Sequence, residues 1–384
     1  METKNGRLLP LFLKINFQKT TFVAMILKHL SLTQYKNISA KQFDFNQKIN
    51  CFIGDNGVGK STVLDAIYHL AFGKSYFNPT AVQNIEFGKE FFLLEGRFEK
   101  EAGRLEKIVC SFKKGQKKII KRNDKIYEKL TDHIGRIPTV MISPADRDLI
   151  TEGSSARRKF MDGVIGQTDP LFLQDLLNYS KILSQRNALL KYFALNHTFN
   201  SDTLNVYNQQ LEQFGVPVFQ KRKAFMETFL PIFMERYKKI SNRKEKITIE
   251  YITHLNEMNF SELLETSLSK DKNSQYTTVG VHKDDLDFLL TGQPIKKFGS
   301  QGQQKSFLVA LKMAQLDFLK IQTGIAPLLL LDDVFDKLDQ DRVSQIVEMV
   351  DQNDFGQIFI TDTHEERTLK ALSKSQKNYE LFHL

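Results

Sequence analysis

A glycine-rich stretch constrains the fold of this chain more than any other feature. The residues GDNGVGKS, Gly54 to Ser61, match the phosphate-binding pattern G-x-x-x-x-G-K-[ST]. The apolar run INCFI comes directly before them, and the following residues, STVLDAIYHLAF, carry apolar side chains at helical spacing. A strand, a glycine loop and a helix in this order turn backbone N–H groups towards phosphate at the helix N-terminus. We therefore expect an α/β protein of the P-loop nucleoside triphosphatase class.

The same pattern assigns roles to the residues of the loop. Lys60 is expected to reach the β- and γ-phosphates of ATP, and the hydroxyl of Ser61 is expected to ligate Mg²⁺. The residues predicted to surround the phosphates are Gly54, Asp55, Asn56, Gly57, Val58, Gly59, Lys60, Ser61 and Thr62. A chance glycine-rich turn is the alternative, and the strand and helix on either side argue against it.

Two carboxylates follow an apolar run in PLLLLDDVFDKLD, residues 327–339. Ligands of open α/β sheets bind at the carboxyl ends of strands, so we expect Asp332 to hold Mg²⁺ and Asp333 to polarise the attacking water. An aspartate at the second position is shorter than the glutamate of fast ATPases with this arrangement, and it predicts slow hydrolysis. The alternative is a strand followed by a capping aspartate.

A second strand end is predicted at QIFITDTHEER, residues 357–367, where Thr361, Thr363 and His364 follow apolar residues. Thr363 is expected to contact the γ-phosphate. It also fits a helix N-cap with Glu366 at the capping-box position, and the two roles are compatible.

A second polar, glycine-centred turn, Ser300-Gln301-Gly302-Gln303-Gln304, opens into a helical pattern. Together with the phosphate loop and the LLLLDD strand, it describes an ABC-type ATPase head. In that architecture the second turn faces the phosphate loop of another subunit, so we expect Ser300, Gln301, Gly302 and Gln303 to bind ATP across a C₂ homodimer. Asp339 is expected near the dimer contact. An ordinary helix start is the alternative reading of the turn.

The distribution of strand and helix patterns along the sequence predicts an ATPase lobe with an inserted, mostly helical second lobe. Strand patterns and turn signals occupy residues 25–150, long amphipathic helical patterns dominate residues 151–272, and alternating strands and helices return in residues 273–384. Residues 1–24 precede the first clean strand pattern, and we interpret them as an extension that arises from a misassigned start codon.

The net charge of +9 favours an anionic partner such as nucleic acid. Basic residues gather in the predicted hairpins, where they are expected to bind DNA phosphates: Lys113, Lys114, Lys117, Lys118, Lys121 and Arg122. Smaller basic sets lie at 221–223 and 238–246, and a solvated face is the alternative for each of these groups. Two cysteines without metal or disulfide spacing, and no run near the ~20 apolar residues of a membrane span, predict a cytoplasmic protein.

Beyond these motifs, the chain resembles the RecF family of bacterial DNA replication and repair ATPases from about Met25 onwards. The resemblance rests on ISPADRDLITEGSSARRKFMD (142–162), YSKILSQRNALLK (179–191), TVGVHKDDLDF (278–288) and FGSQGQQKS (298–306). It implies an ATP-dependent dimer that binds gapped DNA, where duplex meets single strand, and that acts with RecR and RecO in loading the RecA recombinase. Lys36 and Lys283 stand where the family usually has arginine, and Phe77 replaces a usual basic residue.

Two other classes share the ABC motifs. An ABC head of a transporter would need a membrane partner chain, and the stretches that resemble RecF weigh against it. The head of a larger SMC-like or nuclease machine would need a long coiled coil or a metal-rich nuclease domain, and the sequence contains neither pattern.

Overall fold

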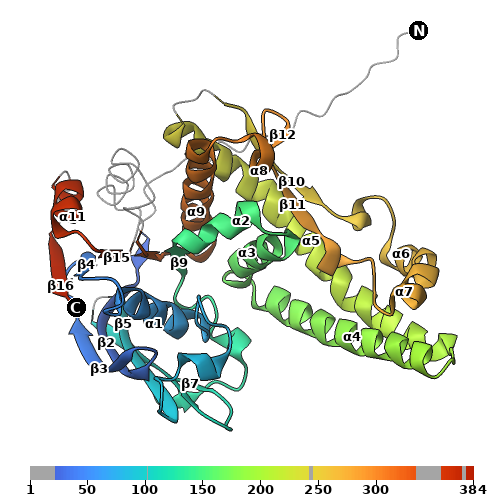
Figure 1. Ribbon diagram of the computed structural model, residues 1–384, viewed down its shortest axis with the longest axis horizontal. Helices are drawn as coiled ribbons and strands as arrows, with labels where there is room; N and C mark the ends of the chain where they lie inside the picture. The colour runs from blue at the N-terminus through green and yellow to red at the C-terminus, as the bar shows by residue number, and fades with distance from the viewer. Residues whose placement is uncertain (1–21, 102, 242–244, 334–355, 374–377) are drawn as a thin grey trace.

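The computed structural model describes residues 22–101, 103–241, 245–333, 356–373 and 378–384 (Figure 1). Within them, a five-stranded sheet has the order β16-β4-β15-β14-β9, and every adjacent pair is parallel. Its strands are β4 (Ile49–Ile53), β9 (Thr139–Ile142), β14 (Leu328–Leu331), β15 (Gln357–Asp362) and β16 (Tyr379–His383). The first four consist entirely of buried residues, as in sheets covered on both faces. The expected largely parallel sheet is confirmed, although β16 was not predicted.

A six-stranded antiparallel sheet, with the order β3-β2-β5-β6-β7-β8, lies beside it. Its strands are β2 (Ile26–Tyr35), β3 (Ile38–Asp44), β5 (Phe91–Glu101), β6 (Arg104–Lys113), β7 (Ile119–Arg122) and β8 (Lys125–Ile126). The predicted hairpin turns are confirmed, and left-handed φ values at Gly103, Gly115, Asn123 and Asp124 allow the chain to reverse. Helix α1 (Lys60–Phe72) packs between the two sheets in one apolar core with Leu30, Phe92 and Leu328.

Long helices follow β9, as the sequence predicts. They are α3 (Ser154–Gly166), α4 (Pro170–Leu195) and α5 (Ser201–Ile240), and α9 (Gln301–Thr323) comes later in the chain. The break between α4 and α5 is stabilised by Asn200, whose side chain accepts a hydrogen bond from the backbone N–H of Thr203 (2.8 Å). None of the described helices is long and apolar enough to span a membrane.

Smaller elements complete the described part of the chain. The strands are β1 (Val23–Ala24), β10 (Ile247–Ile252), β11 (Asp285–Leu290), β12 (Gln293–Pro294) and β13 (Ile325–Ala326). The helices are α2 (Asp148–Thr151), α6 (Phe260–Thr266), α7 (Leu268–Ser274), α8 (Ile295–Phe298) and α11 (Glu365–Leu372), with a 3₁₀ turn at Pro144–Arg147. Residues 1–21 of the predicted extension and the predicted helix 340–351 lie outside the described residues. Val23 and Ala24 pair with β13.

Helix α9 joins the helical part of the chain to the parallel sheet. One apolar core contains residues of α3, α5, β10, β11 and α9 together with the face of the sheet formed by Cys51, Val140 and Leu329. Every residue of α9 from Val309 to Leu319 is buried. Segments on both sides of the boundaries expected near residues 150 and 272 therefore contribute to one shared core. The division into lobes stays a prediction.

A buried ionic network ties α3 and α5 to the segment before β11. Arg222 on α5, which the sequence placed in a basic surface set, is only 1% exposed. Its guanidinium donates to both carboxylate oxygens of Asp162 (2.9 Å each) and to Asp284 Oδ2 (2.7 Å). The expectation that residues 221–223 form a basic surface is wrong for Arg222, because opposing carboxylates hold it in the core.

We predict that Arg222→Met lowers the free energy of unfolding by about 3–5 kcal/mol, because the substitution leaves the buried carboxylate of Asp284 and the half-buried carboxylate of Asp162 without their counter-charge. The neighbouring Lys223→Met is the matched control: Lys223 is exposed, and its replacement should stay within about 0.5 kcal/mol of the wild type. Urea unfolding of the three proteins measures the difference. Equal losses in the two variants would contradict the assigned role of Arg222.

Candidate functional site

The glycine loop lies between β4 and α1, where the sequence predicts it. Gly57 and Gly59 adopt φ values of +87° and +109°, which side chains disfavour. The first helical hydrogen bond of α1 runs from the N–H of Val63 to the carbonyl of Gly59 (3.0 Å). The amides of Lys60, Ser61 and Thr62 therefore have no carbonyl partner within the helix, and the end of α1 can receive an anion.

Lys60 folds back across this loop. The side chain is 7% exposed, and its ammonium donates to the carbonyl oxygens of Gly54 (2.6 Å) and Asp55 (2.8 Å). These contacts hold the charge beside the amides of the loop, and phosphate oxygens can replace the carbonyls as acceptors.

Asn37, between β2 and β3, buttresses the loop. Its amide donates to the carbonyl of Gly57 (2.8 Å) and accepts from the hydroxyl of Thr62 (2.7 Å). The sequence pattern does not identify Asn37, because the residue lies outside the local motif and only the fold brings it to the loop. Thr62, which was predicted to bind nucleotide, is used here to hold the loop in shape.

The carboxylate pair lies at the carboxyl edge of the parallel sheet, beside the loop. Asp332, at the end of β14, is 4% exposed, and its burial raises the pKa of the carboxyl above the usual range although hydrogen bonds from Ser61 and Thr361 oppose the shift. The Thr361 hydroxyl is 2.9 Å from Asp332 Oδ1 and 2.9 Å from the backbone N of Asp333. The structure thus brings together Ser61 and Asp332, the two residues predicted to ligate Mg²⁺.

Thr363 directly follows β15, two residues after Thr361. Its backbone N–H donates to Asp362 Oδ1 (2.7 Å), and Asp362 also accepts from the N–H of His364 (3.3 Å). Burial opposes ionisation of Asp362, but hydrogen bonds from Arg367, Thr368 and His364 outweigh it and lower the pKa. The predicted capping box of Thr363 and Glu366 is wrong: α11 has His364 as its N-cap residue, without a side-chain cap.

Asp333 adopts a left-handed φ of +49° and lines a cavity of about 370 Å³. The first turns of α9 also line it, at Gln301, Gln304 and Lys305. The cavity therefore joins the predicted water-polarising residue to the base of the second glycine turn.

The second turn is a capping box at the start of α9. The Ser300 hydroxyl accepts from the N–H of Gln303 (3.2 Å), and Gln303 Oε1 accepts from the N–H of Ser300 (2.6 Å). The Gln303 amide also donates to Glu245 (2.7 Å). These bonds are those of an ordinary helix start, yet Ser300 and Gln301 remain exposed and Gly302 is half-buried.

The turn stands away from the phosphate loop of its own chain. Further along α9, Lys312 donates to the carbonyl of Met141 (2.9 Å) and pairs with Asp146 (2.6 Å), which fixes the helix at the carboxyl edge of β9. At ~1.5 Å per residue, Gln301 lies ~16 Å along the helix axis beyond Lys312. Of the described residues that line the two cavities at this turn, none belongs to the loop from Gly54 to Thr62. Asp339 lies outside the described residues.

The predicted DNA-binding residues lie on β6, β7 and the turn between them, but two of them are already neutralised. Arg122 pairs with Glu106, and Lys114 pairs with Glu90 (3.1 Å). Lys113 and Lys117 are exposed, Lys118 and Lys121 are half-buried, and no carboxylate within the described ranges pairs with any of these four. DNA binding by the hairpin stays a prediction, and it depends mainly on Lys113, Lys117, Lys118 and Lys121.

Two of the positions that differ from the usual RecF pattern touch each other. The Lys36 ammonium lies 2.6 Å from the carboxylate of Asp65 and 5.2 Å from the ring centroid of Phe77. Asp65 is fully buried and also accepts hydrogen bonds from Tyr35 and Ser75. Lys36 is therefore held by a buried carboxylate and an aromatic face instead of projecting towards a ligand.

These features define a class, the ABC-type P-loop ATPases. The family model of the AAA domain matches residues 29–380. An Smc head domain from Pyrococcus furiosus shares the fold, with a TM-score of 0.52 at 15% identity over 90% of this chain and 92% of that one. A solved structure of the recombination mediator protein RecF with ATPrS, from the RecFOR pathway, superposes with a TM-score of 0.85 at 30% identity, covering 94% of this chain and 97% of that one.

Curated relatives identify the family within this class. The DNA replication and repair protein RecF of Flavobacterium johnsoniae is 58% identical over 94% of this chain and all of its own length. The RecF of Bacteroides thetaiotaomicron is 47% identical over 93% of this chain and 96% of its own length. The chain belongs to the RecF family, a family of ATPases in DNA replication and repair. The heads of transporters and of larger SMC-like or nuclease machines are not favoured.

We predict that Asp332→Asn raises the melting temperature of the nucleotide-free protein at neutral pH. The raised pKa means that the folded state holds the proton more tightly than the unfolded state, so the ionised carboxylate costs stability above the raised pKa and this cost fades as the pH falls. The difference in melting temperature should shrink as the pH is lowered towards that pKa. Asp132→Asn, at an exposed position, is the control; the idea fails if Asp332→Asn melts lower than the wild type at neutral pH.

Proposed function

We propose that this chain is an ATP-driven clamp on DNA. Two copies bind head to tail, so that ATP lies between the loop Gly54–Thr62 of one copy and the Ser300–Gln303 turn of the other. The observation that carries the proposal is the position of that turn, which is exposed at the end of a buried helix and stands away from the loop of its own chain. A C₂ arrangement supplies each loop with the turn that its own chain cannot bring to it.

The donor atoms beside the loop fit Mg²⁺. The Ser61 hydroxyl and the buried carboxylate of Asp332 are close enough to share a hydrogen bond, and hard oxygen ligands of this kind suit the ion. A bound ion supplies positive charge to the phosphates. Its charge would also favour the ionised form of Asp332, which burial alone disfavours.

Each residue of the site then has a task in the cycle. Lys60 exchanges its two carbonyl acceptors for phosphate oxygens, and the amides at the start of α1 hold the same group. Asp333 orients water for attack on the γ-phosphate. Its short side chain sets a slow rate, which suits hydrolysis that times the opening of a clamp rather than fast turnover.

The closed pair is proposed to hold DNA where duplex meets single strand, and to act with RecR and RecO in loading a recombinase. The net charge of +9 and the lysines of the β6–β7 hairpin support contact with the phosphate backbone, and DNA contact is proposed to speed hydrolysis. The RecFOR pathway of the solved relative supports the partner proteins.

We predict that Ser300→Arg blocks ATP-driven dimerisation but leaves ATP binding intact, because the large cation occupies the face that meets the partner's phosphate loop. Light scattering with ATP and Mg²⁺ should give the mass of two chains for the wild type and of one chain for the variant. Ser300→Thr, which keeps both the hydroxyl and the helix N-cap, is the control and should dimerise like the wild type. A variant that dimerises like the wild type would rule out the shared site.

We predict that Asp333→Asn traps the closed dimer, because the amide cannot accept a proton from the attacking water. The variant should lose at least about tenfold in hydrolysis rate and stay dimeric on DNA after free ATP is removed. Gel filtration after rapid desalting measures the lifetime of the dimer. If the variant dissociates as fast as the wild type, hydrolysis does not open the clamp.

We predict that the triple variant Lys113→Gln, Lys117→Gln and Lys121→Gln binds duplex DNA more weakly and with a shallower salt dependence. Each lost phosphate contact should reduce the slope of log K against log salt by about 0.9. Lys114→Gln is the matched control, because Glu90 already neutralises Lys114. An unchanged slope in the triple variant would place the DNA surface elsewhere.

A further inference from the structure

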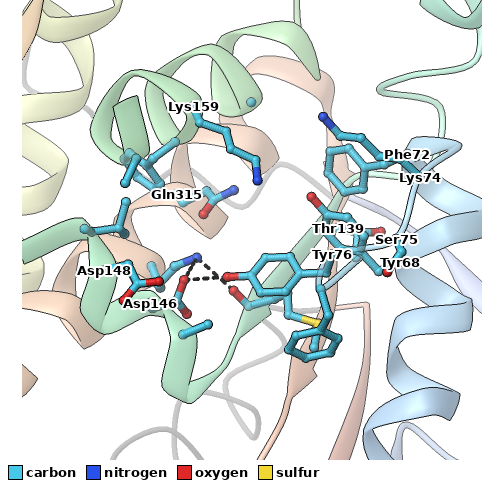
Figure 2. Close-up of a pocket in the computed structure, with 18 of the residues that line it drawn as sticks. Tyr68, Phe72, Lys74, Ser75, Tyr76, Thr139, Asp146, Asp148, Lys159 and Gln315 are labelled. Atoms are coloured by element: carbon cyan, nitrogen blue, oxygen red, sulfur yellow. Dashed lines mark hydrogen bonds and ion pairs between the residues drawn. The ribbon is translucent and has the colours of Figure 1, made fainter. Parts of the chain in front are cut away.

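A second cavity of about 370 Å³ shares Asp146 and Lys312 with the cavity at Asp333. Figure 2 shows side chains that line this second cavity. We call it the Lys74–Lys159 cavity. Its walls come from α1 and the segment after it, from β9, from the 3₁₀ turn before α2, from α3 and from α9. None of the residues that line it belongs to the phosphate loop. It is large enough for a small molecule but has no role in the function proposed above.

Two lysines supply positive charge to this cavity from separate walls. Lys159 extends inwards from α3, and Lys74 comes from the segment after α1 (Figure 2). No ion pair joins either lysine to a carboxylate in the part of the chain that the structure describes. Both lysines are exposed, but partial desolvation lowers the pKa of Lys74, and the positive charges of Lys159 and Lys118 lower it further. A bound anion would relieve this repulsion.

The carboxylate in the wall of the cavity cannot serve as that anion. Asp146 already accepts from the Tyr76 hydroxyl (2.7 Å) and from the backbone N–H of Ser143 (2.8 Å), and it pairs with Lys312 (2.6 Å). Asp148 also lines the cavity and is exposed, as the two lysines are, but no ion pair joins it to either of them. Within the described residues the two lysines therefore have no paired carboxylate.

Gln315 on α9 presents an unused amide to the cavity. The residue is 7% exposed, and its Oε1 is buried without a hydrogen-bond donor among the described residues. Figure 2 shows Gln315 and Lys159 among the side chains that line the cavity. A buried acceptor without a donor is unfavourable, so this position suits a ligand that carries an N–H or O–H group.

Aromatic side chains form part of the remaining walls, namely Tyr68, Phe72, Tyr76 and Phe160. Aromatic side chains can pack against a planar ring. A nucleotide-binding site needs three features, and this cavity has them: positive charge at one end, an amide that can pair with a ring edge, and aromatic side chains in the walls.

We propose that the Lys74–Lys159 cavity binds one nucleoside phosphate, with the phosphate between the two lysines and the base directed towards Gln315. The nucleotide can come from two sources, a free mononucleotide or the 5′-phosphorylated end of a DNA strand. Because Asp146 and Lys312 border both cavities, the occupied site would lie directly behind the wall of the cavity that contains Asp333.

Fluorescent nucleotides test the proposal and distinguish the two sources. The probes are 2-aminopurine nucleoside 5′-monophosphate and a gapped duplex with 2-aminopurine at a 5′-phosphorylated end, both measured with ADP and Mg²⁺ saturating the phosphate loop. Stacking quenches this base, and the chain contains no tryptophan to interfere with the signal. A matching duplex with a 5′-hydroxyl end measures the contribution of the phosphate.

Two kinds of variant make the result specific. Lys74→Gln with Lys159→Gln removes the charges and should weaken binding by roughly tenfold or more. Gly163→Leu should block the cavity without disturbing the fold, because Gly163 lines it and a Cβ there meets nothing within 4 Å. Lys270→Gln, at an exposed position on α7, is the charge-matched control and should bind like the wild type.

The results distinguish a site for free nucleotide from a site for a DNA end. Quenching of the free mononucleotide that both cavity variants abolish supports a site for free nucleotide, and quenching confined to the 5′-phosphorylated duplex supports a site for a DNA end. The proposal is overturned if neither probe is quenched, or if the cavity variants bind as tightly as the wild type. This test does not depend on dimerisation, so it can fail while the clamp stands.

Discussion

The burial of α9 between the parallel sheet and α5 is the packing interaction on which the rest of this structure depends. The helix is covered along the whole run from Val309 to Leu319, and Lys312 fixes it to the edge of β9 through Met141 and Asp146. A helix held so firmly in its middle cannot tilt without opening the core. Its exposed first turn is therefore held at a set distance beyond the sheet, and the placement of Ser300 follows from apolar packing far from any ligand.

The fixed position of α9 explains why one chain contains two turns that are each suited to phosphate. The loop after β4 is complete in its own geometry, with Asn37 supporting it and Lys60 folded across it. The capping box at Ser300 is equally complete. None of the described residues that line the cavities beside it belongs to that loop. Asp333 lies in a cavity that α9 also lines. Closure of a dimer on ATP would therefore press on the same helix that forms the wall of the Asp333 cavity.

The sequence predicted those parts of the site that depend on local pattern. The phosphate loop, the strand that leads to Asp332 and the turn at Ser300 each follow from a short run of residues, and the parallel sheet follows from its apolar strands. Asn37, the Ser61–Asp332 contact and the burial of Arg222 depend on residues far apart in the chain, so no local pattern contains them. The capping box at Thr363 failed because Asp362 binds the neighbouring amides more directly.

Complementation between two inactive variants tests the shared site most directly. Lys60→Ala removes the phosphate contact of one half-site, and Ser300→Arg removes the other half-site, so neither protein alone should hydrolyse ATP. A mixture forms heterodimers in which one composite site keeps both an intact loop and an intact turn, and the account predicts that hydrolysis returns. If the mixture stays as inactive as its components while both variants remain folded, each chain must use its own turn, and the clamp with shared sites is wrong.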